Sequence, residues 1–126
     1  MSTLLENQAP DLTLIFGEKG REFLSKCVET LTHALPVEEV WLFGSCTEGK
    51  PTTDSDVDLF VVLADDHRLL RPNLAAFQVV AGFPNRPPVD VVSTTKSQWE
   101  YEQSHPFGVF GEIAAKGIKI YDKRSA

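Results

Sequence analysis

The chain has 126 residues, with 18 acidic and 12 basic side chains and a formal net charge of -6. Apolar residues make up 42% and charged residues 24%, which is the composition of a folded globular protein. We therefore expect a single domain over residues 1–126, with a core that needs neither disulfides nor structural metals. Because phosphate surfaces attract an excess of Lys and Arg, the acidic balance argues against direct binding of nucleic acid or of an anionic membrane.

The acidic excess is concentrated in one segment. Residues 38–66 contain eight acids and one base, a net charge of -7, whereas the rest of the chain has ten acids and eleven bases. Such a segment is either a solvated acidic surface or a set of carboxylates held together for a cation.

Nothing in the sequence indicates export or membrane insertion. The two cysteines, Cys27 and Cys46, are too few for a disulfide framework and lack the spacing of zinc ligands. Residues 1–10 have neither the basic nor the apolar part of a signal peptide, and no apolar run approaches the ~20 residues that span a bilayer. These features predict a reduced, cytoplasmic protein.

Helices and strands are predicted to alternate along the chain. Residues 12–16 form a short apolar stretch whose pattern does not decide between helix and strand. Apolar residues at helical spacing predict a helix over about 18–35. Short apolar runs predict strands over 40–43 and 56–63, and the second of these, apolar on both faces, is expected at the centre of a sheet.

The middle of the chain predicts another helix and a third strand. The helix covers residues 72–82, with Pro72 tolerated in its first turn. The isolated apolar run over 89–92 predicts the strand. The helix is expected to turn these apolar residues inward: Leu74, Phe77, Val80 and Ala81.

The C-terminal part predicts two short helices and a last strand. Ser97 is expected to cap a helix that runs through Glu102, with Glu100 at the capping-box position. A second helix is predicted by Phe107, Phe110, Ile113 and Ala114. It is expected to end at Gly117 as a C′ glycine, before a strand over 118–121. The predicted fold class is α/β (α+β), a small mixed sheet with helices packed on it.

The strongest chemical signal is the pair Asp56 and Asp58 at the start of the second predicted strand. Alternate residues of a strand share a face, so both carboxylates project from the same side, roughly 6.5–7 Å apart. Carboxylate oxygens at this spacing can converge on one hard cation or flank two. A third carboxylate, Asp90, could face them if the strand over 89–92 pairs beside the one over 56–63. For each aspartate, the alternative is a solvated strand end.

Gly44 and Ser45 follow a predicted strand, where backbone N–H groups and a hydroxyl can hold phosphate oxygens, although most such pairs are simply turns. The segment from Gly44 to Lys50 also matches the phosphate-loop pattern G-x-x-x-x-G-K. Pro51 stands where that motif needs Ser or Thr, which excludes this interpretation. An EF-hand loop is excluded because Leu59 stands where its sharp turn needs Gly.

Gly44-Ser45, the pair Asp56-x-Asp58 and Asp90 together resemble the signature of a minimal nucleotidyltransferase domain of the polymerase-β-like superfamily. The resemblance extends over about residues 23–121 and implies the fold of that superfamily. It also implies transfer of a nucleoside monophosphate from a nucleoside triphosphate, ATP or another, to an acceptor hydroxyl, with release of pyrophosphate.

The resemblance assigns a role to each residue of the signature. Asp56 and Asp58 would hold Mg²⁺, two ions in all, and Asp90 would share a metal and help to activate the acceptor oxygen. Gly44 and Ser45 would hold the β- and γ-phosphates of the nucleotide.

Small members of this superfamily often carry arginines shortly after the Gly-Ser pair, where this chain has Cys46 and Glu48. Glu48 would repel a triphosphate, and Lys50 offers the local positive charge. This departure keeps open a catalytically weakened module that neutralises a partner protein by binding it.

A minimal domain of this kind resembles the antitoxin half of bacterial toxin–antitoxin pairs. That resemblance implies a HEPN-type ribonuclease toxin as the partner protein and adenylylation of a toxin tyrosine as the reaction. The alternatives are the binding module and a small-molecule nucleotidyltransferase that acts on an aminoglycoside-like acceptor.

Overall fold

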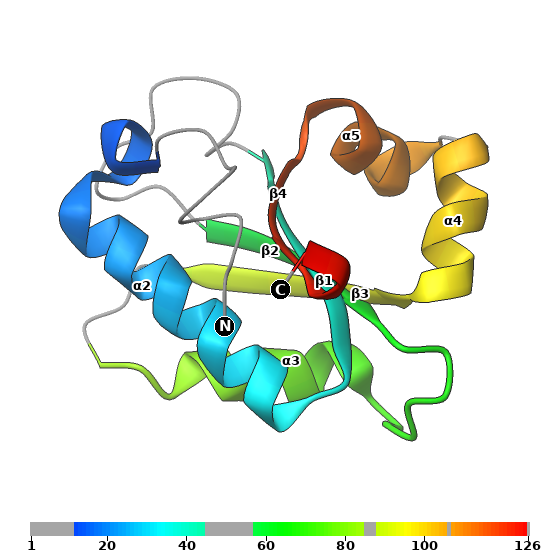
Figure 1. Cartoon of the computed structure of the whole chain (residues 1–126), viewed down its shortest axis with the longest axis horizontal. Helices are drawn as coiled ribbons and strands as arrows, with labels where there is room; N and C mark the ends of the chain where they lie inside the picture. Colours follow the sequence, from blue (N-terminus) through cyan, green and yellow to red (C-terminus); the bar gives the residue numbers. More distant parts are fainter. Residues whose placement is uncertain (1–11, 45–56, 85–87, 106, 126) are drawn as a thin grey trace.

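The fold is described by a computed structural model over residues 12–44, 57–84, 88–105 and 107–125 (Figure 1). Within these residues each helix and strand predicted from the sequence is present. In chain order the elements are α2 (Leu12–Ala34), β1 (Val37–Phe43), β2 (Val57–Leu63), α3 (Pro72–Ala81), β3 (Val89–Thr95), α4 (Lys96–Ser104), α5 (Gly108–Lys116), β4 (Ile118–Asp122) and the short 3-10 helix η2 (Lys123–Ser125).

The strands form a mixed sheet in the order β3-β2-β1-β4. β1 is antiparallel to both β2 and β4, whereas β2 and β3 are parallel. A parallel pair requires a crossover connection, and α3 lies on the path between β2 and β3. The predicted class, a small mixed sheet with helices packed on it, is confirmed, and so is the central place of β2.

One face of the sheet packs against α2 and α3. Leu24, Val28 and Leu31 of α2 recur every three or four residues and are fully buried, as the helical periodicity predicts. They join the odd-numbered residues of β2 in one apolar cluster. α2 also extends back to Leu12, so the undecided stretch over residues 12–16 is helical.

The opposite face packs against α4 and α5 through aromatic rings. Even-numbered residues of β2 point to this face because side chains alternate along a strand. Phe60 and Trp99 are completely buried, with ring centroids 4.7 Å apart. Trp41 and Phe110 pack edge-on or tilted against Trp99, at 5.5 and 6.4 Å. We call Trp41, Phe60, Trp99 and Phe110 the aromatic cluster.

Charged side chains buried beside the aromatic cluster are paired. Glu39 accepts hydrogen bonds from Trp41 Nε1 at 2.9 Å and from Lys96 Nζ at 2.6 Å. Lys119 Nζ lies 3.7 Å from Glu39 and 3.0 Å from Asp122. Burial raises the pKa of Asp122, but hydrogen bonds, first of all from Lys119, outweigh burial and leave that pKa below its ordinary value. These contacts tie the start of α4 to β1 and β4.

The inward face of α3 differs from the prediction. Leu74, expected to face the core, is 44% exposed, and the fully buried residues of the helix are Ala76 and Val80. Residues four apart share a helix face, whereas Leu74 lies two residues before Ala76 and so about 200° around the axis. The two small or branched residues, rather than the leucine, fit against the sheet.

The start of α4 also differs from the prediction. β3 continues through Thr95, which replaces Ser97 as the N-cap and accepts a hydrogen bond from Gln98 N at 3.3 Å. The Ser97 hydroxyl instead donates to Asp65 Oδ1 at 3.0 Å. Glu100 is therefore not at a capping-box position. It lies 3.9 Å from Lys96 Nζ, one turn earlier on the helix.

Gly117 ends α5 as expected, but its backbone is not left-handed, with φ at -68°. It is constrained by space instead, because a Cβ there would lie 2.5 Å from Ile113 O and 3.2 Å from Leu42 O. In the part of the chain that the structure describes, no helix is long and apolar enough to cross a membrane.

Candidate active site

The end of β1 lies beside the starts of β2 and β3, at one end of the strands of the sheet. Phe43, the last residue of β1, pairs with Asp58 of antiparallel β2. Asp58 in turn pairs with Asp90 of parallel β3. In Figure 1 the strands β2 and β3 run side by side from the same end. The third predicted strand does pair beside the second, which is the condition for Asp90 to face Asp58, and this pairing brings two of the predicted site residues together.

Asp58 and Asp90 share one face of the sheet because they are register partners. Neighbouring strands lie about 4.8 Å apart, so the two carboxylates start one strand spacing from each other. Asp58 is half-buried, whereas Asp90 is exposed on the edge strand. Asp90 Oδ1 accepts a hydrogen bond from Val91 N at 3.0 Å, which orients this carboxylate. Asp90 thus sits at a strand edge, yet it is placed to act together with Asp58.

The carboxylates of Asp58 and Asp90 lie on a face of the sheet that is otherwise covered by apolar side chains, and these form an apolar wall. Asp58 and Phe60 are two residues apart in β2, so they lie on the same face, the one that carries the aromatic cluster. Phe43 packs against the same cluster. An apolar wall lowers the local dielectric, which strengthens the attraction between these carboxylates and a cation.

Gly44 lies directly against the Asp58 carboxylate. Its φ is +81°, in the left-handed region that favours glycine. A Cβ built at this position would fall on the Asp58 side chain. The glycine therefore allows the backbone after β1 to approach the carboxylate, as a turn beside a phosphate or metal site requires.

Three predicted site residues, Ser45, Lys50 and Asp56, lie outside the described residues. Among the described residues, no group of three His, Cys, Asp or Glu side chains is arranged to hold a metal ion. Asp58 and Asp90 supply two hard carboxylate donors on one face, and this donor chemistry fits a divalent cation such as Mg²⁺.

Sequence reasoning missed two contributors to the site. Phe43 could have been found, because the last residue of a strand that ends at Gly44 must face the start of an antiparallel neighbour. The Val91 amide could not, because its role depends on β3 being the edge strand of the described sheet, where that N–H bonds the Asp90 side chain instead of a strand.

Comparison with known proteins gives the family of the chain. A family model described as a nucleotidyltransferase domain matches residues 24–115, so the chain belongs to that family. The polymerase-β-like superfamily predicted from the sequence is thereby confirmed, and the chain is a nucleotidyltransferase domain. No curated protein sequence matches it. Among solved structures, it is similar to a candidate nucleotidyltransferase from Sulfolobus solfataricus, with 23% identity and a TM-score of 0.47 over 64% of this chain and 70% of that one.

Proposed function

We propose that this domain transfers AMP from ATP to a hydroxyl group of a partner protein and releases pyrophosphate. The proposed acceptor is a tyrosine of a HEPN-type ribonuclease toxin, for which the chain acts as the antitoxin. Membership of the nucleotidyltransferase family supports nucleotidyl transfer. The acceptor is supported by the resemblance to small antitoxin nucleotidyltransferases and by the acidic balance of the chain.

The observation that carries the proposal is the register of Asp58 with Asp90 beside Gly44. Carboxylate oxygens on one face of two adjacent strands are the ligands that a divalent cation prefers. Gly44 adds a backbone turn that approaches the carboxylate closely. Together the carboxylates would hold the metal of a metal–triphosphate complex, and the backbone at Gly44 would hold its phosphates.

Each residue has a part in the proposed reaction. Asp58 and Asp90 would hold Mg²⁺ with Asp56, and Gly44 with Ser45 would bind the β- and γ-phosphates. A bound divalent cation supplies charge neutralisation of the triphosphate and acidifies the acceptor hydroxyl.

Bonds and charges balance in this reaction. The acceptor oxygen bonds to the α-phosphorus, while the bond from that phosphorus to the bridging oxygen breaks and pyrophosphate leaves with the electron pair. The hydroxyl proton passes to solvent water, and Asp90, oriented through Oδ1 by the Val91 amide, would keep its other oxygen for the cation.

The test uses purified protein, labelled ATP, Mg²⁺ and the product of the gene adjacent to that of this chain. Wild-type protein should transfer label to the adjacent-gene product. Asp58→Asn and Asp90→Asn should each lower the rate by about a hundredfold or more, because each removes a carboxylate that would hold the cation beside the reacting phosphates. The matched control is Asp66→Asn, which makes the same change at an exposed aspartate beyond the other end of β2.

Two outcomes count against this function. Absence of label on the adjacent-gene product would do so, and so would equal labelling by wild type and Asp58→Asn. Calorimetry of ATP with Mg²⁺ then separates the remaining hypotheses, because a module that acts by binding alone releases no heat in that titration.

A further inference from the structure

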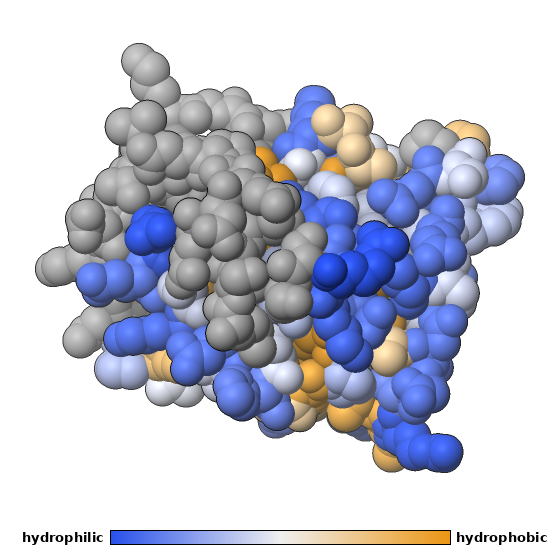
Figure 2. All heavy atoms as spheres, in the orientation of Figure 1, coloured by the Kyte–Doolittle hydropathy of each residue, from blue (hydrophilic) through white to orange (hydrophobic). Residues whose placement is uncertain are grey.

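Large apolar side chains are exposed where α4 meets α5. Phe107 is 80% exposed, Tyr101 57% and Val109 41%, three of the five large hydrophobic residues that are exposed in the described part. The other two are Leu70 and Leu74, before and within α3, and in Figure 2 hydrophobic atoms also show at the lower part of the molecule. We call Tyr101, His105, Phe107 and Val109 the aromatic corner.

The aromatic corner is held in place by local contacts. The His105 ring stacks on Tyr101, with centroids 4.3 Å apart and an interplanar angle of 15°. His105 N also donates a hydrogen bond to Tyr101 O at 3.1 Å. Three residues after Phe107, Phe110 packs 5.7 Å from Phe60 and so anchors α5 to the core. Aromatic side chains presented in a fixed geometry lose little entropy when a partner covers them.

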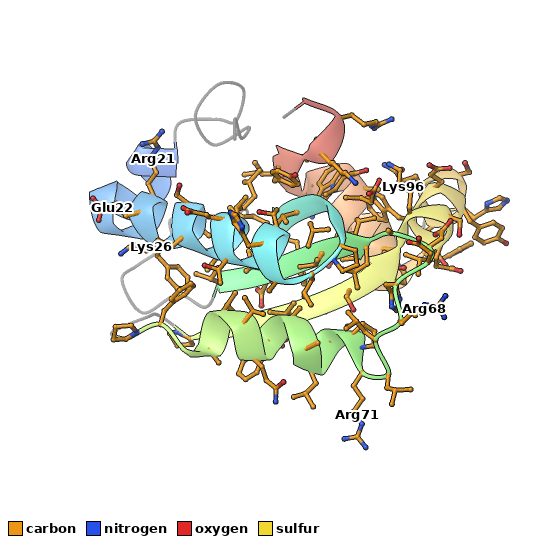
Figure 3. The ribbon with its side chains drawn as sticks, turned by 60° about the horizontal axis from the view of Figure 1, so that its bottom comes forward. Arg21, Glu22, Lys26, Arg68, Arg71 and Lys96 are labelled. Carbon is orange, nitrogen blue, oxygen red and sulfur yellow. The ribbon has the colours of Figure 1, made fainter. Side chains whose placement is uncertain are left out.

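Acidic side chains predominate around the aromatic corner, and Lys96, at the start of α4, is paired with the buried Glu39 at 2.6 Å (Figure 3). Residues 97–115 contain Glu100, Glu102 and Glu112 and neither Lys nor Arg. The Glu100 side chain is 63% exposed. A protein that covers this surface must therefore bring an apolar pocket flanked by Lys or Arg, because opposite potentials favour association and like charges oppose it.

The aromatic corner lies away from the candidate active site. β2 and β3 begin at Asp58 and Asp90 and end at Leu63 and Thr95, and α4 starts directly after Thr95. Figure 1 shows the starts of these strands at the left and the meeting point of α4 and α5 at the right. A protein bound at the corner leaves the metal-binding carboxylates uncovered.

We propose that the aromatic corner is a docking surface for a basic partner protein. This inference rests on the proposed function, because a ribonuclease needs a positively charged surface to bind RNA and so has the chemistry that the corner selects. Docking and nucleotidyl transfer then use separate surfaces of the domain, and each can be removed without the other.

The experiment measures the affinity of the adjacent-gene product for the full chain by calorimetry. Phe107→Ser and Tyr101→Ala should each raise Kd by about tenfold or more, as exposed aromatic anchors do. The matched control is Leu70→Ser, because Leu70 is 98% exposed but lies before α3, outside the corner. Leu70→Ser should leave Kd within about twofold, as small surface changes do. Thermal melts establish that each variant is folded.

Changes in salt concentration and variants of the acidic residues test whether the docked partner is basic. The double variant Glu100→Gln and Glu102→Gln should bind more slowly, and the wild-type association rate should fall as salt is raised. A rate that salt does not change contradicts a basic partner.

Docking and transfer fail in different ways. Asp58→Asn should keep the wild-type Kd and lose labelling, whereas Phe107→Ser should lose affinity. Binding that depends on Phe107 without any labelling keeps the docking surface and overturns the proposed function. Labelling by wild type, together with equal affinity in wild type and Phe107→Ser, keeps the proposed function and overturns the docking surface. No binding by wild type, or self-association of the chain that Phe107→Ser abolishes, overturns the docking proposal.

Discussion

Gly44 must satisfy two constraints at once. Its φ of +81° is costly for any residue with a Cβ, and the space that a Cβ would need is filled by the Asp58 carboxylate. The two constraints have one cause, because the chain must turn at the end of β1 while staying against the first residues of β2. The glycine therefore serves the placement of Asp58 as much as the turn.

Gly44→Ala should lower the free energy of unfolding by about 1–2 kcal/mol from backbone conformation alone, and by more if the Asp58 side chain cannot move aside. It should also lower labelling of the acceptor, because the displaced carboxylate no longer faces Asp90. Urea unfolding and the labelling assay measure the two effects. Gly82→Ala is the matched control, because Gly82 has φ -76° and nothing within 4 Å of a Cβ. Equal stability of the two variants would contradict the constraint at Gly44.

The first turn of α4 is fixed by hydrogen bonds to a residue that lies far from it in the sequence. Asp65, thirty-two residues earlier, accepts hydrogen bonds from Ser97 N at 2.9 Å and from Ser97 Oγ at 3.0 Å. Thr95 satisfies Gln98 N. Two donors of the first helical turn are thus satisfied, and the connection after β2 is fastened to α4.

Asp65→Ala should lower the free energy of unfolding by about 1–2 kcal/mol, because it leaves both Ser97 donors without their acceptor. Ser97→Ala should cost less, since the backbone N–H still reaches Asp65. Urea unfolding of the two variants and of Asp66→Ala, an exposed neighbour in the same turn, gives the order. A cost for Ser97→Ala equal to that for Asp65→Ala would show that the hydroxyl alone carries the contact.

Periodicity was enough to predict the elements, because burial on one or two faces leaves a pattern in neighbouring residues. It failed where a distant contact decides. Ser97 has the chemistry of an N-cap, but β3 continues to Thr95 because it pairs with Leu63. Leu74 has the apolarity of a core residue, but the stripe of Ala76 and Val80 faces the sheet. At the site, the sequence did not give the order of the strands. It suggested that Asp90 could face Asp58, and the register of β2 with β3 shows that the two residues are partners.

Across the whole molecule, the acids of residues 38–66 that the structure describes lie at two ends of the sheet. Glu38 and Glu39 lie at the start of β1 and pair with lysines, Glu38 with Lys123 at 3.5 Å. Asp65 follows the end of β2 and binds Ser97. These acids lie at the opposite end of the strands from Asp58. Part of the charge of -7 is thus used in structural contacts, so the net charge of the segment does not tell how many of its acids could bind a metal ion.

This division predicts how Mg²⁺ should act on stability. An ion that binds the folded state at a hundred times its Kd adds about 2.7 kcal/mol to the free energy of unfolding, which raises the melting temperature by several degrees. Asp58→Asn should remove most of that gain, whereas Asp66→Asn, at the other end of the sheet, should keep it. Thermal melts with and without Mg²⁺ measure the difference. If both variants lose the gain equally, the ion is bound by diffuse acidic charge, and the register of Asp58 with Asp90 does not make a metal site.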